Sequence, residues 1–108
     1  MDETQQTKIA NYLGLAQRAG QIAAGDEAAK NALLKGKACL LVLAADLAPQ
    51  VRGQLLALAD DDLPLLDWPD KDSLGRIVGK SRRGALALLD PGFTAAILKT
   101  LAQPPHGA

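Results

Sequence analysis

Residues 25–49, GDEAAKNALLKGKACLLVLAADLAP, decide the fold of this chain. The stretch opens on Asp26 and Glu27 and reaches Lys35 nine residues later, the order of charges that suits the dipole of an α-helix. Residues 37–44 then form a nearly continuous apolar run of strand length, which is typical of a central strand covered on both faces. A helix followed by such a strand indicates an α/β protein.

Helix and strand patterns alternate on both sides of this stretch, which favours a sheet with helices on both faces. Before this stretch we expect a helix with Ile9, Leu13 and Ala16 on one face, capped by Thr7 and ended by Gly20, and then an extended piece at 21–24. After it we expect a turn at 46–49, a helix at 50–59 and an edge strand at 63–68. A helix at 73–79 capped by Asp72 or Ser73, a strand at 84–89, a turn at 90–92 and a helix at 93–101 complete the expected elements. We expect one domain over residues 1–108, with an ordered core at about 7–102 and a flexible tail at 103–108.

The composition predicts a small protein without disulfide bonds or structural metal sites. It has 108 residues with one cysteine and one histidine, so neither an internal disulfide nor a zinc site is expected. No apolar run approaches the roughly 20 residues that span a bilayer, and the polar first residues do not form a signal peptide. We therefore expect a cytoplasmic protein with no membrane association, metal or cofactor.

The charges balance overall but are unevenly distributed. Twelve basic and twelve acidic residues argue against a nucleic-acid binder that works through a global positive field. Six aspartates gather in residues 60–72, whereas the basic residues of 30–37 and 76–83 have no acids among them. A local basic face results if the fold brings those two segments together.

The remaining reactive or aromatic side chains do not form a catalytic set. We find no nucleophile–base pair, metal-ligand set or phosphate loop in the sequence. Gly79-Lys80-Ser81 ends like a phosphate-binding loop, but Leu74 stands where that motif needs its first glycine. Trp68 is expected to cover the edge of the sheet, and Cys39 to be an inert core residue in an apolar strand.

Three features occur together in a known family. They are Gly25-Asp26-Glu27 opening a helix with Lys30 one turn on, Ala-x-Asp-x-x-Pro at 44–49, and Leu-Gly-Arg-x-Val-Gly at 74–79 before a basic loop and a strand. From about Lys8 to Leu101 the chain resembles the ribosomal L7Ae/L30e superfamily of kink-turn-binding proteins, especially its small bacterial members. The resemblance implies a three-layer α/β/α sandwich with a four-stranded mixed sheet. It also implies binding to RNA that carries a short, sharp bend flanked by sheared G·A pairs.

The resemblance implies a binding site in two parts. Gly25, Asp26, Glu27 and Lys30 would meet the bases at the bend, and the 80–82 loop the protruding nucleotide. The unpaired N–H groups of a helix start suit a phosphate-rich ligand, while the Glu27 carboxylate can accept from guanine N–H groups. The complete set of candidate RNA-binding residues is Gly25, Asp26, Glu27, Lys30, Lys37, Arg76, Lys80, Ser81, Arg82 and Arg83.

Two positions depart from the family's pattern. Asp26 stands where strongly binding members carry Asn, and an ionised Asp can only accept hydrogen bonds. Lys80 stands where an apolar residue is commoner, so charge replaces packing. The first departure implies weaker binding or a different preferred RNA. The second implies looser selectivity for the bend.

The same residues allow plainer interpretations. Asp26 and Glu27 can act only on the helix dipole, Lys30 can be a solvated partner of Asp26, and the 76–83 residues an ordinary soluble surface. The aspartates of 60–72 are interpreted as solvated loop residues that keep RNA away from that edge. The leading hypothesis is a non-enzymatic, ribosome- or translation-associated protein that binds structured RNA, with ribosomal RNA a candidate and DNA not expected. The alternative is a protein–protein adaptor of this fold that has lost kink-turn binding.

Overall fold

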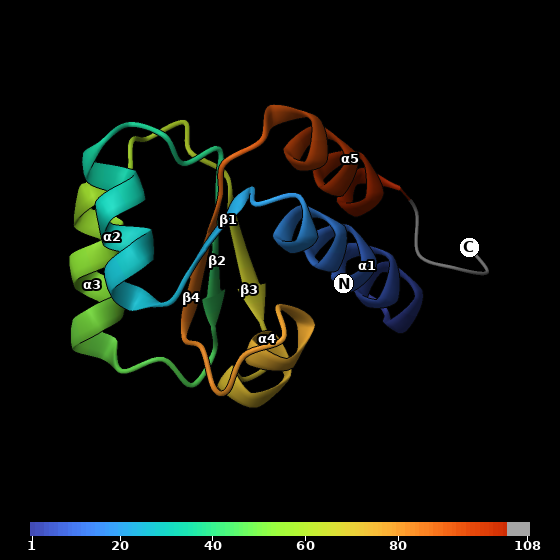
Figure 1. Cartoon of the computed structure of the whole chain (residues 1–108), viewed down its shortest axis with the longest axis horizontal. Helices are drawn as coiled ribbons and strands as arrows, with labels where there is room; N and C mark the ends of the chain where they lie inside the picture. The colour runs from blue at the N-terminus through green and yellow to red at the C-terminus, as the bar shows by residue number, and fades with distance from the viewer. Residues whose placement is uncertain (104–108) are drawn as a thin grey trace.

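The computed structural model describes residues 1–103, in which a sheet lies between two layers of helices (Figure 1). The elements are α1 (Glu3–Arg18), β1 (Ile22–Ala24), α2 (Asp26–Leu34), β2 (Leu40–Ala44), α3 (Pro49–Leu58), β3 (Leu65–Trp68), α4 (Lys71–Ile77), β4 (Ala85–Leu88) and α5 (Pro91–Ala102). In Figure 1, α2 and α3 cover one face of the sheet, α1 and α5 cover the other, and α4 lies at one end. The expected three-layer α/β/α sandwich is confirmed. Of the tail expected at 103–108, residues 104–108 lie outside the described residues.

The sheet is mixed, with its four strands in the order β1-β4-β2-β3. β2 pairs antiparallel with β4 and parallel with β3, so Val42 has Leu86 on one side and Leu66 on the other. All residues of β2 and β4 are buried, which confirms the central buried strand expected in 37–44. The strand begins at Leu40, three residues later than expected.

Alternate side chains of β2 build two separate cores. Val42 and Leu40 face the cluster that α1, α4 and α5 cover, together with Ile9 and Ile97. Leu41 and Leu43 face the opposite cluster under α2 and α3. Alanines supply the buried face of α2, which allows this helix to lie close to the sheet. The two helix layers are thereby packed against opposite faces of the sheet.

The first helix begins earlier than the sequence pattern indicated. Asp2, and not Thr7, caps α1: its carboxylate accepts a hydrogen bond from Gln5 N at 2.7 Å. Thr7 lies inside the helix, where its hydroxyl donates to the carbonyl oxygen of Glu3. The helix therefore begins before Thr7, because the Asp2 carboxylate accepts from a free N–H group of the first turn.

Two further helix starts were also placed wrongly. Asp70, and not Asp72 or Ser73, caps α4, since its carboxylate accepts from Ser73 N at 2.7 Å. Asp90 likewise caps α5 by accepting from Phe93 N, so the segment expected as a turn at 90–92 is the first turn of that helix. Each of these aspartates caps its helix because the backbone N–H three residues later lies in the first turn and has no partner within the helix.

Trp68 and Cys39 occupy different depths from those expected. Trp68 is 2% exposed and belongs to the core beside α1, so its structural role is confirmed, although it lies within the core and not over the sheet edge. Cys39 precedes β2 and is half-buried, so its assignment to a core strand was wrong.

The cap of α4 gives the fold a pH dependence that can be measured. The backbone N–H of Ser73 donates to Asp70 and holds the pKa of that carboxyl below its ordinary value of 3.8. A lowered pKa in the folded state means that Asp70 stabilises the fold above the ordinary carboxyl pKa, and that this contribution is lost as pH falls through the folded-state pKa. We expect Asp70→Ala to lower Tm near neutral pH, with the difference from the unmodified chain shrinking below pH 3.8. Thermal unfolding followed by circular dichroism measures this, with the exposed Asp62→Ala as control; an equal difference at all pH values would contradict it.

Candidate functional site

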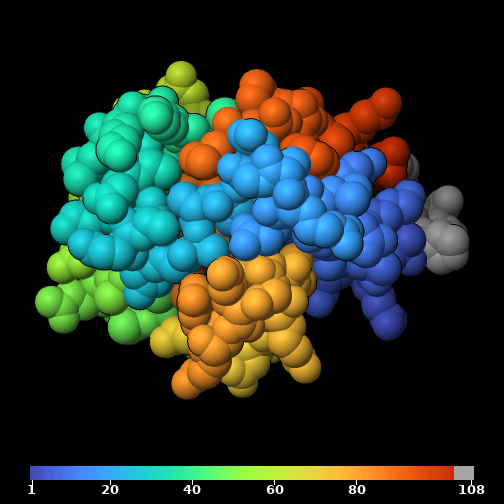
Figure 2. All heavy atoms as spheres, in the orientation of Figure 1, coloured from blue at the N-terminus to red at the C-terminus, as the bar shows by residue number. Residues whose placement is uncertain are grey.

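The start of α2 and the end of the α4–β4 connection line one surface hollow of about 550 Å³. Figure 2 shows these two segments meeting on the face toward the viewer, the first in cyan and the second in orange. The lining residues are Ala24, Gly25, Asp26, Glu27, Ala28, Lys71, Arg82, Arg83 and Gly84. Glu27 and Arg82, far apart in the sequence, therefore face the same space.

Backbone pairing brings these segments together. β1 pairs antiparallel with β4, and the N–H of Gly25, just beyond β1, donates to the carbonyl oxygen of Ala85 at 2.8 Å. Gly25 has φ 112° and ψ 164°, a conformation found almost exclusively in glycine. This residue turns the chain out of the sheet and into α2. The glycine is thus required by the backbone at this point, whatever approaches from outside.

Arg83 connects the two halves of the hollow. Its Cδ lies 3.6 Å from the position that a Cβ on Gly25 would take. Its Nη1 donates to the Ser81 hydroxyl at 3.2 Å and to the Arg82 carbonyl oxygen at 2.9 Å. The half-buried Arg83 side chain therefore braces the basic loop, which we define as residues 79–83, against the start of α2.

The basic loop lies directly on α4. A Cβ added at Gly75 would overlap the carbonyl carbon and oxygen of Ser81, so only glycine fits there without movement of the loop. Lys80 N donates to the Gly75 carbonyl oxygen at 2.9 Å, and Arg83 N donates to that of Lys71 at 3.1 Å. The backbone of the loop is held in place while the side chains of 80–82 remain exposed.

Arg82 is shared between two carboxylates. Its Nε lies 3.0 Å from Asp72 Oδ1, and its Nη2 lies 3.9 Å from Asp46 Oδ2. The Arg82 side chain is 64% exposed, and exposed ion pairs of this kind contribute about 0–1 kcal/mol. An anion that enters the hollow can replace these carboxylates at little cost.

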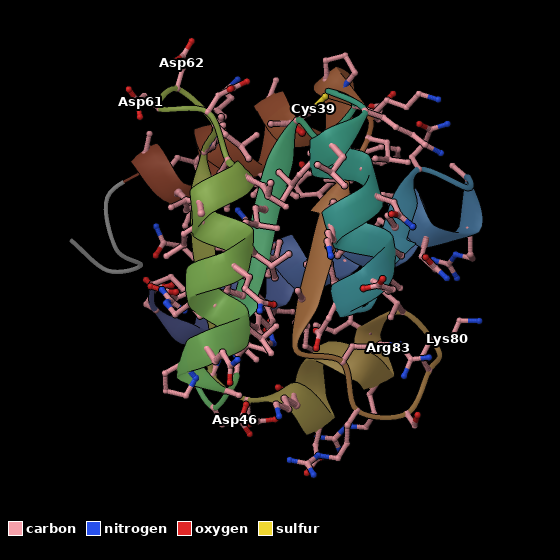
Figure 3. The ribbon with its side chains drawn as sticks, turned by 90° about the vertical axis from the view of Figure 1, so that its left-hand side faces the viewer. Cys39, Asp46, Asp61, Asp62, Lys80 and Arg83 are labelled. Carbon is pink, nitrogen blue, oxygen red and sulfur yellow. The ribbon has the colours of Figure 1, made fainter. Side chains whose placement is uncertain are left out.

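Lys71 lines the hollow and Asp46 lies beside it at Arg82, although neither was among the candidate residues. Asp46 accepts from the backbone N–H of Lys71 at 2.9 Å, which ties the end of β2 to the start of α4. Figure 3 shows Asp46 at the same end of the molecule as Arg83 and Lys80. The motif Ala-x-Asp-x-x-Pro contained a signal for Asp46, since a carboxylate that follows a buried strand has no place in the core. No sequence signal marked Lys71.

The other candidate residues lie at different distances from the hollow. Lys30 is exposed one turn further along α2. Arg76, Lys80 and Ser81 line an adjoining hollow of about 410 Å³, which also includes Asp72 and Arg82. Lys37 lies beyond the opposite end of α2, so the fold does not bring it to the others. Cys39, two residues later, is at the far end of the molecule from Lys80 and Arg83 in Figure 3.

The acidic stretch divides between two places. Asp61 and Asp62 are exposed at the end of the molecule opposite Lys80 and Arg83 (Figure 3), as expected of solvated loop residues. Asp72, in contrast, pairs with Arg82 beside the basic loop. The interpretation of the whole stretch as one acidic edge was therefore wrong, because β3 carries the chain back to the basic end.

Residues 1–103 contain neither a candidate metal-ion cluster nor a candidate membrane-spanning helix. Among these residues no three His, Cys, Asp or Glu side chains are placed to hold a metal ion together. No helix in this range has the length and the apolar content needed to cross a membrane.

Comparisons with known proteins show the family of the chain and support its fold. The model of the Ribosomal protein L7Ae/L30e/S12e/Gadd45 family matches residues 7–97. A protein of unknown function from Bacillus halodurans C has a similar structure, with a TM-score of 0.80 and 28% identity over 89% of this chain and 98% of the other. The 15.5kD RNA binding protein of Giardia lamblia is similar in fold, with a TM-score of 0.74 and 22% identity over 94% of this chain and 88% of the other. No curated protein matches the chain in sequence.

The contact between Gly75 and the basic loop can be tested by adding one methyl group. We expect Gly75→Ala to lower the free energy of unfolding by about 1–3 kcal/mol, because the loop must move away from α4. Gly53→Ala is the matched control: it lies in α3 where an added Cβ meets no atom of residues 1–103 within 4 Å. The control should raise stability by about 0.5–1 kcal/mol. Urea unfolding followed through Trp68 fluorescence gives both values, and a Gly75→Ala variant as stable as the control would show that the contact is not formed.

Proposed function

Because the chain belongs to the ribosomal protein L7Ae/L30e/S12e/Gadd45 family, we propose that it is a non-enzymatic protein that binds structured RNA with a kink-turn-like bend. The observation that carries the proposal is that Glu27 and Arg82 face one hollow, so a single ligand can touch both. The fold it shares with the Giardia RNA binding protein supports the proposal.

The hollow has the chemistry that a sharply bent RNA requires. A bend crowds phosphates together, and the start of α2 offers unpaired N–H groups and a partial positive charge to them. Arg82 adds a guanidinium, which can bind a phosphate with two parallel hydrogen bonds. These contacts give affinity and position without reading the sequence.

Glu27 supplies the contact that distinguishes one base from another. It is exposed in the first turn of α2 and lines the hollow. A carboxylate beside phosphates is unfavourable unless it accepts a hydrogen bond, and the N1–H and amino groups of guanine can donate one. An exposed guanine at the bend would provide both. Glu27 therefore selects for base edges that a regular duplex does not present.

The basic loop is suited to the nucleotide that protrudes at the bend. Its backbone is held by hydrogen bonds to Gly75 and Lys71, so little backbone entropy is lost when Lys80, Ser81 and Arg82 contact the RNA. Lys80 gives this loop a charge, which favours phosphate contact over packing against a base. We infer a tolerance for different protruding nucleotides.

Asp26 sets the strength of the binding. Its Oδ1 lies 3.2 Å from the position of a Cβ on Gly84, at the inner side of the hollow, where Asp26 adds negative charge close to the phosphates. An Asn there would donate as well as accept. We infer that the chain binds its RNA with lower affinity than family members that carry Asn. We also infer that this RNA belongs to the ribosome or the translation apparatus in the cytoplasm.

A protein–protein adaptor of the same fold is the second candidate. It is favoured by the carboxylates of Asp46 and Asp72 beside Arg82, and by the net charge of zero. In that case the chain binds bent RNA no better than straight duplex.

The first test measures selectivity for the bend. We expect the unmodified chain to bind a kink-turn RNA more tightly than a straight duplex, and Glu27→Gln to lose about 1–3 kcal/mol of that preference, since the carboxylate accepts from base donors. Asp61→Asn, a matched loss of carboxylate at the far end, should change nothing. Fluorescence titration at moderate salt measures both, and equal binding to the two RNAs would overturn kink-turn recognition in favour of the adaptor.

The second test concerns the exchange of carboxylates for phosphates. Asp72 competes with RNA for Arg82, so Asp72→Asn should bind kink-turn RNA about twofold to fivefold more tightly, within the range that an exposed ion pair allows. The same titration measures it, with Asp62→Asn as the matched control. Unchanged or weaker binding by Asp72→Asn would show that Arg82 does not contact the RNA.

A further inference from the structure

The outward face of α1 carries a stripe of exposed side chains, three of them polar and one apolar. Lys8, Asn11, Leu15 and Arg18 are separated by three or four residues, so they lie on one side of the helix, and all four are exposed. This side faces away from the core that Ile9, Leu13 and Ala16 form on the opposite side. The stripe takes no part in the site described above.

A groove runs along each side of this stripe. The groove against α4, about 680 Å³, contains Arg18 and Arg76 with the amides of Asn11 and Gln17. The groove against α5, about 530 Å³, contains Lys8 and Lys99 and again Asn11. Among the residues of the described chain that line the two grooves there is no carboxylate. Lys8, Arg18 and Lys99 therefore stand there without a carboxylate among the lining residues, whereas Arg76 is close enough to Asp70 to add to the Ser73 hydrogen bond in lowering the pKa of that carboxyl, and it shares the basic-loop hollow with Asp72.

Shared arginines make this surface continuous with the proposed RNA site. Arg82 lines both the hollow at the start of α2 and the hollow of the basic loop. Arg76 lines the basic-loop hollow and also the groove between α1 and α4. Figure 2 shows the blue surface of α1 meeting the orange surface of the 75–85 segment on the same face as the start of α2. One elongated ligand can thus follow the face from α2 to α1.

We propose that this α1 surface, defined by Lys8, Asn11, Arg18, Arg76 and Lys99, binds the sugar–phosphate backbone of one helical arm of the RNA whose bend occupies the first site. The inference rests on the proposed function and extends it to the arm of the RNA. The lysine and arginine side chains match phosphates, and the Asn11 amide can reach a phosphate or a 2′-hydroxyl. A protein partner fits less well, because Leu15 is the one exposed large apolar side chain among the described residues that line the grooves.

The geometry requires an arm of some length. Lys8 and Arg18 are ten residues apart in one helix, a separation of about 15 Å along its axis. A ligand confined to the bend at α2 does not extend along this stripe, whereas a helical arm that leaves the bend along the face does. Binding should therefore depend on arm length through these residues and not through Glu27.

The experiment compares three kink-turn RNAs: one with both arms trimmed, and two with one arm or the other extended by a full helical turn. We expect one of the extended RNAs to bind the unmodified chain more tightly than the trimmed RNA. In Arg18→Gln/Lys99→Gln this gain should be lost, with binding weakened by roughly tenfold and the salt slope reduced by about two. Lys35→Gln, which removes an exposed lysine at the far end of α2, is the control and should keep the gain.

The outcomes separate this inference from the proposed function. Equal binding of all three RNAs by the unmodified chain, or a gain that survives in the α1 variant, would overturn the inference while the bend site stands; the α1 surface would then serve a protein partner or solvent. Binding to none of the RNAs would overturn the proposed function, and the inference with it. Loss of the gain in the α1 variant, with its affinity for the trimmed RNA unchanged, would support both.

Discussion

The hydrogen bond from Gly25 N to Ala85 O ties together the two segments on which the whole functional surface depends. It continues the β1–β4 ladder one residue beyond β1, at the point where the chain leaves the sheet for α2. Because Gly25 adopts a conformation that other residues avoid, the start of α2 is aimed at the end of the basic loop and not along the sheet. The start of α2 and the start of β4 are placed side by side by this junction, since both elements are packed into the core.

Much of the fold could be predicted because it depends on local patterns. The apolar run of 37–44 and the helical spacing around it place a buried strand between helices, and the structure has them there. The positions of helix starts were less predictable, because Asp70 and Asp72 are equally good caps in sequence terms. Only the path of the chain decides which N–H groups remain free. The site followed the same rule: the fold brings Glu27 and Arg82 to one hollow, while the seating of Ser81 on Gly75 needed the folded backbone, since no local pattern records the approach of two distant segments.

Some of the opposite charges that balance in this chain also lie close together in space. Arg52 pairs with Asp67 and Arg82 with Asp72, so part of the basic charge is answered by acids from the 60–72 stretch. These pairs are exposed and therefore exchangeable. Acids beside the basic loop weaken attraction to any polyanion, but they weaken it equally for straight and bent RNA. They consequently lower non-specific binding more than they lower the preference for a ligand that also satisfies Glu27.

The hollow and the α1 stripe thus differ in rigidity, and we expect them to contribute differently to binding. The hollow has a backbone fixed by Gly75, Lys71 and Arg83, so it can discriminate between shapes. The α1 stripe has long, exposed side chains that are not fixed, and such side chains add affinity for a phosphate backbone without selecting its sequence. A chain with little net charge cannot rely on long-range attraction, so it gains from contacts spread along one continuous face. Selection at the bend and affinity along the arm would then be separable properties of the same small fold.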